Sequence, residues 1–153
     1  MDLDTSGQLE DLQGIRRRRA ELRDSLVAVE GALAAPAPGR MEQWTERVCA
    51  ALMELSADFR EHVTIAEAPD GINARALRSA PRLARTVARL ETEHVELSAL
   101  MDRLLDLLAR PGATTSEQVR DDVTRLLGRL VRHRQRGSDL LYEAWAVDIG
   151  GGD

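Results

Sequence analysis

The sequence predicts an all-α protein, an antiparallel up-down four-helix bundle, and three observations support this prediction. Alanine, leucine, arginine and glutamate dominate the 153 residues, and aromatic residues make up only 3%, a composition that favours helices over sheets. Apolar residues recur at alternating steps of three and four along four segments, which is the spacing of one helix face. Short links containing proline and glycine separate the segments, so consecutive helices should run antiparallel.

The first half of the chain is predicted to contain two helices. The first runs from about residue 8 to 34 and is stopped by the Ala-Pro-Ala-Pro-Gly sequence at 35–39, because proline and glycine cannot continue it. The second runs from about residue 41 to 67 and ends before the Pro-Asp-Gly turn at 69–71. Residues 70–80 are ambiguous, with room for a short helical turn.

The second half is predicted to contain the other two helices. The third begins near Ser79, which is placed as its N-cap, with Pro81 in its first turn. It stops at a Pro-Gly pair. The fourth starts at Thr115 or Ser116, either of which can cap its N-terminus, and it runs to about residue 147.

These helices are expected to form a single domain, residues 8–147, with flexible tails at 1–7 and 148–153. The one cysteine, Cys49, cannot form an internal disulfide. No secretion signal or membrane-spanning run is apparent, so we expect a cytoplasmic protein without a membrane partner. The net charge of -5 likewise gives no reason to expect nucleic acid as a partner.

The second, third and fourth helices each carry one histidine on the apolar stripe: His62, His94 and His133. At about 1.5 Å of rise per residue, they lie roughly 30, 22 and 27 Å from the end of the bundle that holds the first and third connections. The three histidines are therefore predicted to share one layer. On the first helix, Arg18 or Arg19 lies on the inward side instead.

This layer has two interpretations, and the first is a metal centre, because bundle cores bind metals through histidines and carboxylates from facing helices. Neutral imidazole suits iron, zinc or copper, and nearby carboxylates favour iron. Glu91 stands three residues before His94, while Glu67, five residues after His62, reaches inward only if its helix end is distorted. The alternative is a metal-free layer of buried hydrogen bonds that includes the inward arginine.

Three stretches of sequence also match one protein family in order and spacing. They are Arg60-Glu61-His62 with Glu67-Ala68-Pro69, Pro81-Arg82-Leu83 leading to Leu90-Glu91-Thr92-Glu93-His94, and Leu130-Val131-Arg132-His133-Arg134-Gln135-Arg136 with its continuation to Trp145. Over residues 8–147 the chain thus resembles the hemerythrin-like, HHE cation-binding domains of bacteria. Members of this family are four-helix bundles that carry two irons and serve O2 binding, iron or oxygen sensing, or redox protection.

The resemblance implies a metal site formed by His62, His94, His133 and Glu67. It also implies an incomplete ligand set. The first helix has no histidine, and Leu90, Ala66 and Ser138 stand where the family commonly places further ligands. A mononuclear or reduced dinuclear non-haem iron site, or a bundle that has lost its metal, is consistent with these departures.

The expected function is therefore that of a hemerythrin-like iron-binding protein for oxygen or redox sensing or for iron handling, with O2 as a candidate ligand. We predict no catalytic residues and no enzyme activity, because no nucleophile-base pair, phosphate loop or pair of catalytic carboxylates is visible. The alternative is a metal-free helical-bundle module for interaction or regulation. A third hypothesis is a pH-responsive bundle, since three neighbouring imidazoles would repel one another when protonated.

Overall fold

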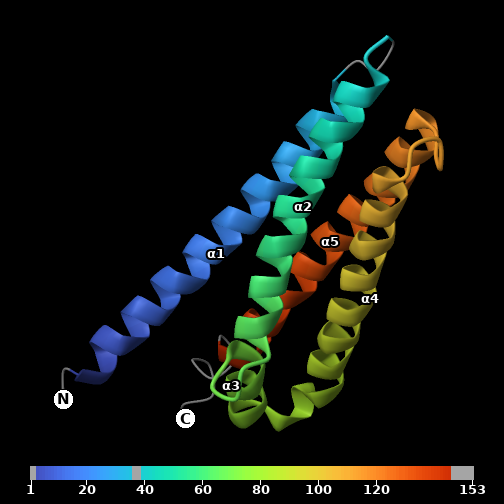
Figure 1. The fold of residues 1–153 in the computed structure, drawn as a ribbon. Helices are drawn as coiled ribbons and strands as arrows, with labels where there is room; N and C mark the ends of the chain where they lie inside the picture. Colours follow the sequence, from blue (N-terminus) through green and yellow to red (C-terminus); the bar gives the residue numbers. More distant parts are fainter. Residues whose placement is uncertain (1–2, 36–38, 146–153) are drawn as a thin grey trace. The chain divides into compact units, whose positions relative to one another are not determined.

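The computed structural model describes residues 3–35 and 39–145, with side chains from residue 13 onward. This part of the chain is all-helical and contains no strand. The elements are α1 (Leu3–Ala34), α2 (Met41–Ala66), α3 (Ile72–Ser79), the 3-10 helix η1 (Pro81–Leu83), α4 (Ala84–Ala109) and α5 (Ser116–Trp145), as drawn in Figure 1. The predicted all-α class is confirmed, whereas the antiparallel four-helix bundle stays a prediction.

Most helix ends lie within a few residues of their predicted positions. α1 begins at Leu3, so part of the predicted N-terminal tail is helical, and the predicted tail 148–153 lies outside the described residues. Thr115 caps α5, because its Oγ1 accepts a hydrogen bond from the backbone N of Gln118 at 3.2 Å. The prediction that Ser79 caps the third helix is wrong. Residues 72–79 form a helix of their own, which places Ser79 at a C-terminus.

The chain divides into two compact units, residues 1–59 and 60–153, and the boundary falls inside α2. A single domain spanning 8–147 stays a prediction. In the first unit, the Ser25 hydroxyl of α1 donates a hydrogen bond to the carboxylate of Asp58 on α2. Arg18 in this unit is half-buried and Arg19 is exposed. Most described members of the predicted apolar stripes of this unit are buried, although Ile15 is only half-buried. The buried members are Leu22, Leu26, Val29, Leu33, Val48, Leu52, Leu55 and Phe59.

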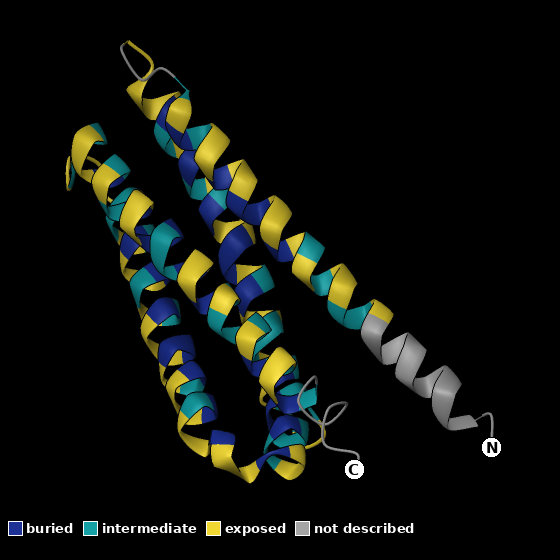
Figure 2. Cartoon of the chain, turned by 180° about the vertical axis from the view of Figure 1, so that it is seen from behind, coloured by how far each residue is buried: buried dark blue, intermediate teal, exposed yellow. Residues whose placement is uncertain are grey.

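The second unit consists of the last turns of α2 together with α3, η1, α4 and α5. The helices α4 and α5 are joined by the short segment 110–115 and run antiparallel, and α3 packs on both. Burial of one leucine side chain contributes about 1.5–3 kcal/mol to the free energy of folding. Buried and exposed residues alternate along the helices (Figure 2). One apolar cluster joins α3, η1, α4 and α5: Ala76, Ala80, Leu83, Val87, Leu90, Leu140 and Ala144.

The turn after α2 fixes where this helix ends. The backbone N of Glu67 still donates to the carbonyl of Val63 at 3.0 Å, and the N of Gly71 then donates to Ala68 at 2.8 Å. Gly71 has an ordinary φ of -73°, so glycine is needed here for space. A Cβ at this position would collide with backbone carbonyl oxygens of the preceding turn. The tight turn therefore holds Glu67 at the end of α2, beside the predicted site.

None of the described helices combines the length and apolar character needed to cross a membrane.

Candidate metal centre

The structure brings the three predicted histidines together within the second unit. His62 comes from the end of α2, His94 from the middle of α4 and His133 from the middle of α5. Their ring centroids are separated by 5.2 Å (62 to 94), 5.9 Å (62 to 133) and 4.8 Å (94 to 133). One nitrogen from each ring lies within 4.8 Å of the other two. We call these three residues the histidine cluster, and the predicted common layer is confirmed for them.

Burial favours the neutral form of the two buried histidines of the cluster, His94 and His133. His94 and His133 are each only 3% exposed, and His62 is half-buried. Burial, reinforced by the neighbouring His133, lowers the pKa of His94 from 6.5 to about 4. Burial also lowers the pKa of His133, although its hydrogen bond to Glu93 opposes this change. Because neutral imidazole is the form that binds metals, burial keeps His94 and His133 in their ligand form.

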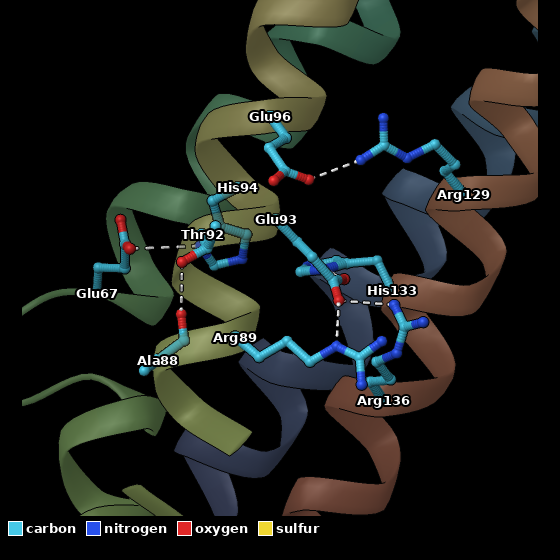
Figure 3. A network of polar contacts seen from close by, with 10 residues as sticks. All are labelled: Glu67, Ala88, Arg89, Thr92, Glu93, His94, Glu96, Arg129, His133 and Arg136. Atoms are coloured by element: carbon cyan, nitrogen blue, oxygen red, sulfur yellow. Dashed lines mark hydrogen bonds and ion pairs between the residues drawn. The ribbon is translucent and has the colours of Figure 1, made fainter. Parts of the chain in front are cut away.

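Glu93 holds the ring of His133 in place. The carboxylate is buried beside the ring, and its Oε2 lies 2.8 Å from Nδ1 of His133. A carboxylate can only accept here, so the neutral imidazole donates from Nδ1 and carries its lone pair on Nε2. Figure 3 shows Glu93 extending from α4 toward α5 to make this contact. The same arrangement of carboxylate and histidine orients the ligands of many metal sites.

Glu67 has a comparable position next to His94. Its Oε1 lies 3.5 Å from Nδ1 of His94, from the turn that follows α2 (Figure 3). Since its side chain is one-third exposed, Glu67 sits at the edge of the layer. Each of the two buried rings thus has a carboxylate near its Nδ1, at 2.8 Å for His133 and at 3.5 Å for His94. Glu91, the other carboxylate singled out in the sequence, instead accepts a hydrogen bond from Asn73 on α3 at 3.4 Å.

Glu93 pairs with the two arginines nearest to the cluster. Arg136 of α5 donates to Oε1 of Glu93 at 2.6 Å, and Nε of Arg89 lies 3.4 Å from the same oxygen. One carboxylate therefore faces two guanidinium groups and one imidazole. A charge-assisted hydrogen bond of this kind is about twice as strong as a neutral one, so the carboxylate is held firmly against His133.

The cluster has the size and donor chemistry of a site for one transition-metal ion. A tetrahedral ion bound by imidazoles at about 2.0–2.1 Å holds its nitrogens roughly 3.4 Å apart. The cluster nitrogens lie within 4.8 Å of one another, so they would need to approach by up to about 1.4 Å to reach that spacing. Three protein ligands would leave further positions on the ion for a small molecule. Among the described residues, these three histidines are the group that could hold a metal ion.

Sequence reasoning identified the three histidines and Glu67 but missed Glu93. Glu93 lies just beside the row of apolar residues, at alternating steps of three and four, that contains His94. A wider stripe would have included Glu93, because it stands three residues after the buried Leu90 and four before the buried Leu97. A buried carboxylate on such a stripe requires a partner, and His133 and Arg136 provide it.

No protein-family model, curated protein or solved structure matches this chain.

Proposed function

We propose that this chain binds one divalent transition-metal ion through Nε2 of His62, His94 and His133. The convergence of three imidazoles in one layer is the observation that carries the proposal. Two of the rings are buried, and each of these has a carboxylate at Nδ1. In this proposal Glu93 orients His133, and Glu67 either orients His94 or supplies a fourth ligand from the edge of the site.

Iron is the metal that we propose, for non-haem iron handling or for oxygen or redox sensing. Imidazole binds iron, zinc and copper, and nearby carboxylates favour iron. The resemblance to hemerythrin-like domains also favours iron, and the four-helix bundle of that family is the fold that the sequence predicts around such a centre. Three histidines and one carboxylate are too few for the family's two-iron set, so we propose one ion. A ferrous ion would supply reversible one-electron chemistry and affinity for O2.

We propose binding or sensing as the role of the site. The described residues around the cluster bring together imidazoles, carboxylates and guanidinium groups, and these can hold an ion and tune its charge. Glu93 is fully engaged by His133, Arg136 and Arg89, so it is poorly placed to exchange protons with a substrate. This engagement supports a static centre over one that turns substrate over.

Elemental analysis of the untagged protein tests the proposal. The protein is purified without added metal, reconstituted with ferrous iron under anaerobic conditions, and passed through a desalting column. We expect about one iron per chain, and less than a tenth of that in the variant His62→Ala/His94→Ala/His133→Ala. Zinc in place of iron would overturn the choice of metal but not the site. An absence of stoichiometric metal under all conditions would refute the site itself.

A pair of glutamate variants tests the part played by Glu67. Glu67→Gln removes the charge beside His94, while Glu91→Gln removes the same charge from a residue that contacts Asn73 instead. Loss of a carboxylate that supports a ligand typically weakens metal binding 10- to 100-fold. We therefore expect weaker iron binding in Glu67→Gln and near-native binding in Glu91→Gln. Equal affinities in both variants would remove Glu67 from the site.

The second candidate function is a metal-free regulatory module, and the network around Glu93 favours it. Two arginines and one histidine already satisfy this buried carboxylate without an ion, as in a structural hydrogen-bond layer. Circular dichroism during thermal unfolding separates the two functions. Ferrous iron should raise the unfolding temperature if the cluster binds it, whereas a metal-free layer would unfold at the same temperature with and without iron.

A further inference from the structure

A groove of about 470 Å³ lies between α4 and α5 in the second unit, and Glu93 is one of its lining residues. We call it the arginine groove. Three of its basic residues, Arg129, Arg132 and Arg136, stand on α5 at the i, i+3, i+7 spacing that places side chains on one helix face. Its full lining is Arg89, Thr92, Glu93, Glu96, Leu97, Arg129, Arg132 and Arg136.

The arginine groove carries a local positive charge in an acidic protein. Four arginines and two glutamates line it, whereas the whole chain has a net charge of -5. Arg129 pairs with Glu96 at 2.8 Å, and Arg136 pairs with Glu93 at 2.6 Å. Two positive charges are thus left over in a concave site, where converging field lines attract anions.

Arg132 is the residue that the groove leaves available. It lies between Arg129 and Arg136 on α5, and its side chain is exposed. Both neighbours have a carboxylate partner on α4, but among the described residues Arg132 has no ion pair with any carboxylate. A guanidinium presents its donors in a planar fork that fits two oxygens of a phosphate group at once. Arg132 is therefore placed to bind an oxyanion that enters the groove.

We propose that the arginine groove is a binding site for a phosphate-class oxyanion, with Arg132 as its principal ligand and Arg129 as a supporting donor. No aromatic side chain lines the groove, so it lacks the stacking surface that commonly receives a nucleobase. The volume is sufficient for two linked phosphate groups, and pyrophosphate carries more negative charge at neutral pH than inorganic phosphate, which suits the two unbalanced positive charges of the groove. Pyrophosphate should accordingly bind more tightly than inorganic phosphate. This proposal is independent of any metal at the histidine cluster.

Glu93 provides a local reporter for such binding. It lines the groove and also accepts the hydrogen bond from His133. An oxyanion drawn toward Arg136 competes with Glu93 for that guanidinium, which changes the field at the ring of His133. Binding should therefore shift the imidazole nitrogen resonances of His133 more than those of His62, which lies on α2 and does not line the groove.

Isothermal titration calorimetry of the whole 153-residue chain, treated with a chelator, tests the proposal, with pyrophosphate, inorganic phosphate and succinate as probes at constant ionic strength. We expect saturable binding of pyrophosphate at one site per chain. In Arg132→Gln the affinity should fall at least about tenfold, because a hydrogen bond between charged groups is lost. The matched control is Arg125→Gln, which removes the same charge from an exposed residue of α5 that pairs with Asp122 and does not line the groove.

Each outcome bears on the proposal. Retained pyrophosphate affinity in Arg125→Gln, together with a shift at His133, supports binding in the groove. Equal losses in the two arginine variants would indicate diffuse attraction to surface charge and would overturn it. Binding of succinate as tight as that of pyrophosphate would overturn the assignment to phosphate chemistry. Iron analysis of Arg132→Gln keeps the two sites distinguishable, because this variant should lose oxyanion binding and still bind iron.

Discussion

Acidification should destabilise the metal-free protein through His94. In the unfolded chain a histidine has its ordinary pKa of about 6.5, whereas in the folded protein the pKa of His94 is lowered to about 4. Between these two values the unfolded chain binds a proton that the folded chain excludes, so stability falls as the pH falls. The contribution of His94 is fully present above pH 6.5 and is lost by about pH 4, with no further loss below that.

The size of this loss follows from the shift in pKa. One pKa unit corresponds to about 1.36 kcal/mol, so the whole window is worth about 3 kcal/mol. Between about pH 7 and about pH 4.5, roughly 2 kcal/mol should be lost. The lowered pKa of His133 acts in the same direction, and paired carboxylates add their own dependence. A comparison with a variant is therefore needed to isolate His94.

Urea unfolding of the wild type and of His94→Gln at both pH values measures the effect, in the presence of a chelator. Glutamine has similar polar character but does not titrate, so the variant should lose about 2 kcal/mol less than the wild type on acidification. Equal m-values for the two proteins would show that each unfolds from an equally compact folded state, so that their stabilities can be compared. Parallel pH profiles in the two proteins would refute the reasoning that burial keeps His94 neutral.

Three further predictions concern single side chains. Glu93→Gln should weaken iron binding 10- to 100-fold by releasing His133, as measured by competition with a chelator, while Glu96→Gln should leave it unchanged. Gly71→Ala should cost roughly 1–3 kcal/mol of unfolding free energy through overpacking, whereas Gly31→Ala, where a Cβ meets nothing within 4 Å, should stabilise α1 by up to about 1 kcal/mol. Both glycine variants are measured by urea denaturation. Thr115→Ala should cost about 1 kcal/mol by removing the cap of α5, and native stability in this variant would show that the hydrogen bond to Gln118 is dispensable.

The helices were predictable because their ends depend on local chemistry. Proline and glycine stop a helix whatever surrounds it, which is why α2 and α4 end within a few residues of the expected positions. The cap at Thr115 is local in the same way. The N-cap prediction for Ser79 is wrong because residues 72–79 form the helix α3. This segment is short enough to be a loop, and its packing on α4 and α5 stabilises it as a helix.

The site was predictable in part for a related reason. Helical periodicity and rise place a histidine on a face and at a height, and these two coordinates were enough to bring His62, His94 and His133 together. They do not say which neighbouring side chain reaches across from another helix. The contact of Glu93 with His133 depends on how α5 is rotated against α4, and the contact of Glu67 with His94 depends on the turn at Gly71. Tertiary packing sets both.

The positions of the three histidines along the chain have a consequence for folding. Residues 62 and 94 are 32 positions apart, and residues 94 and 133 are 39 apart. An ion held by all three would cross-link these distant points and close two long loops. By the chain-entropy estimate used for disulfides, each closure would lower the conformational entropy of the unfolded chain and so raise its free energy by roughly 4 kcal/mol. Such an ion would act as a reversible cross-link, and its release would lower the free energy of unfolding of the second unit.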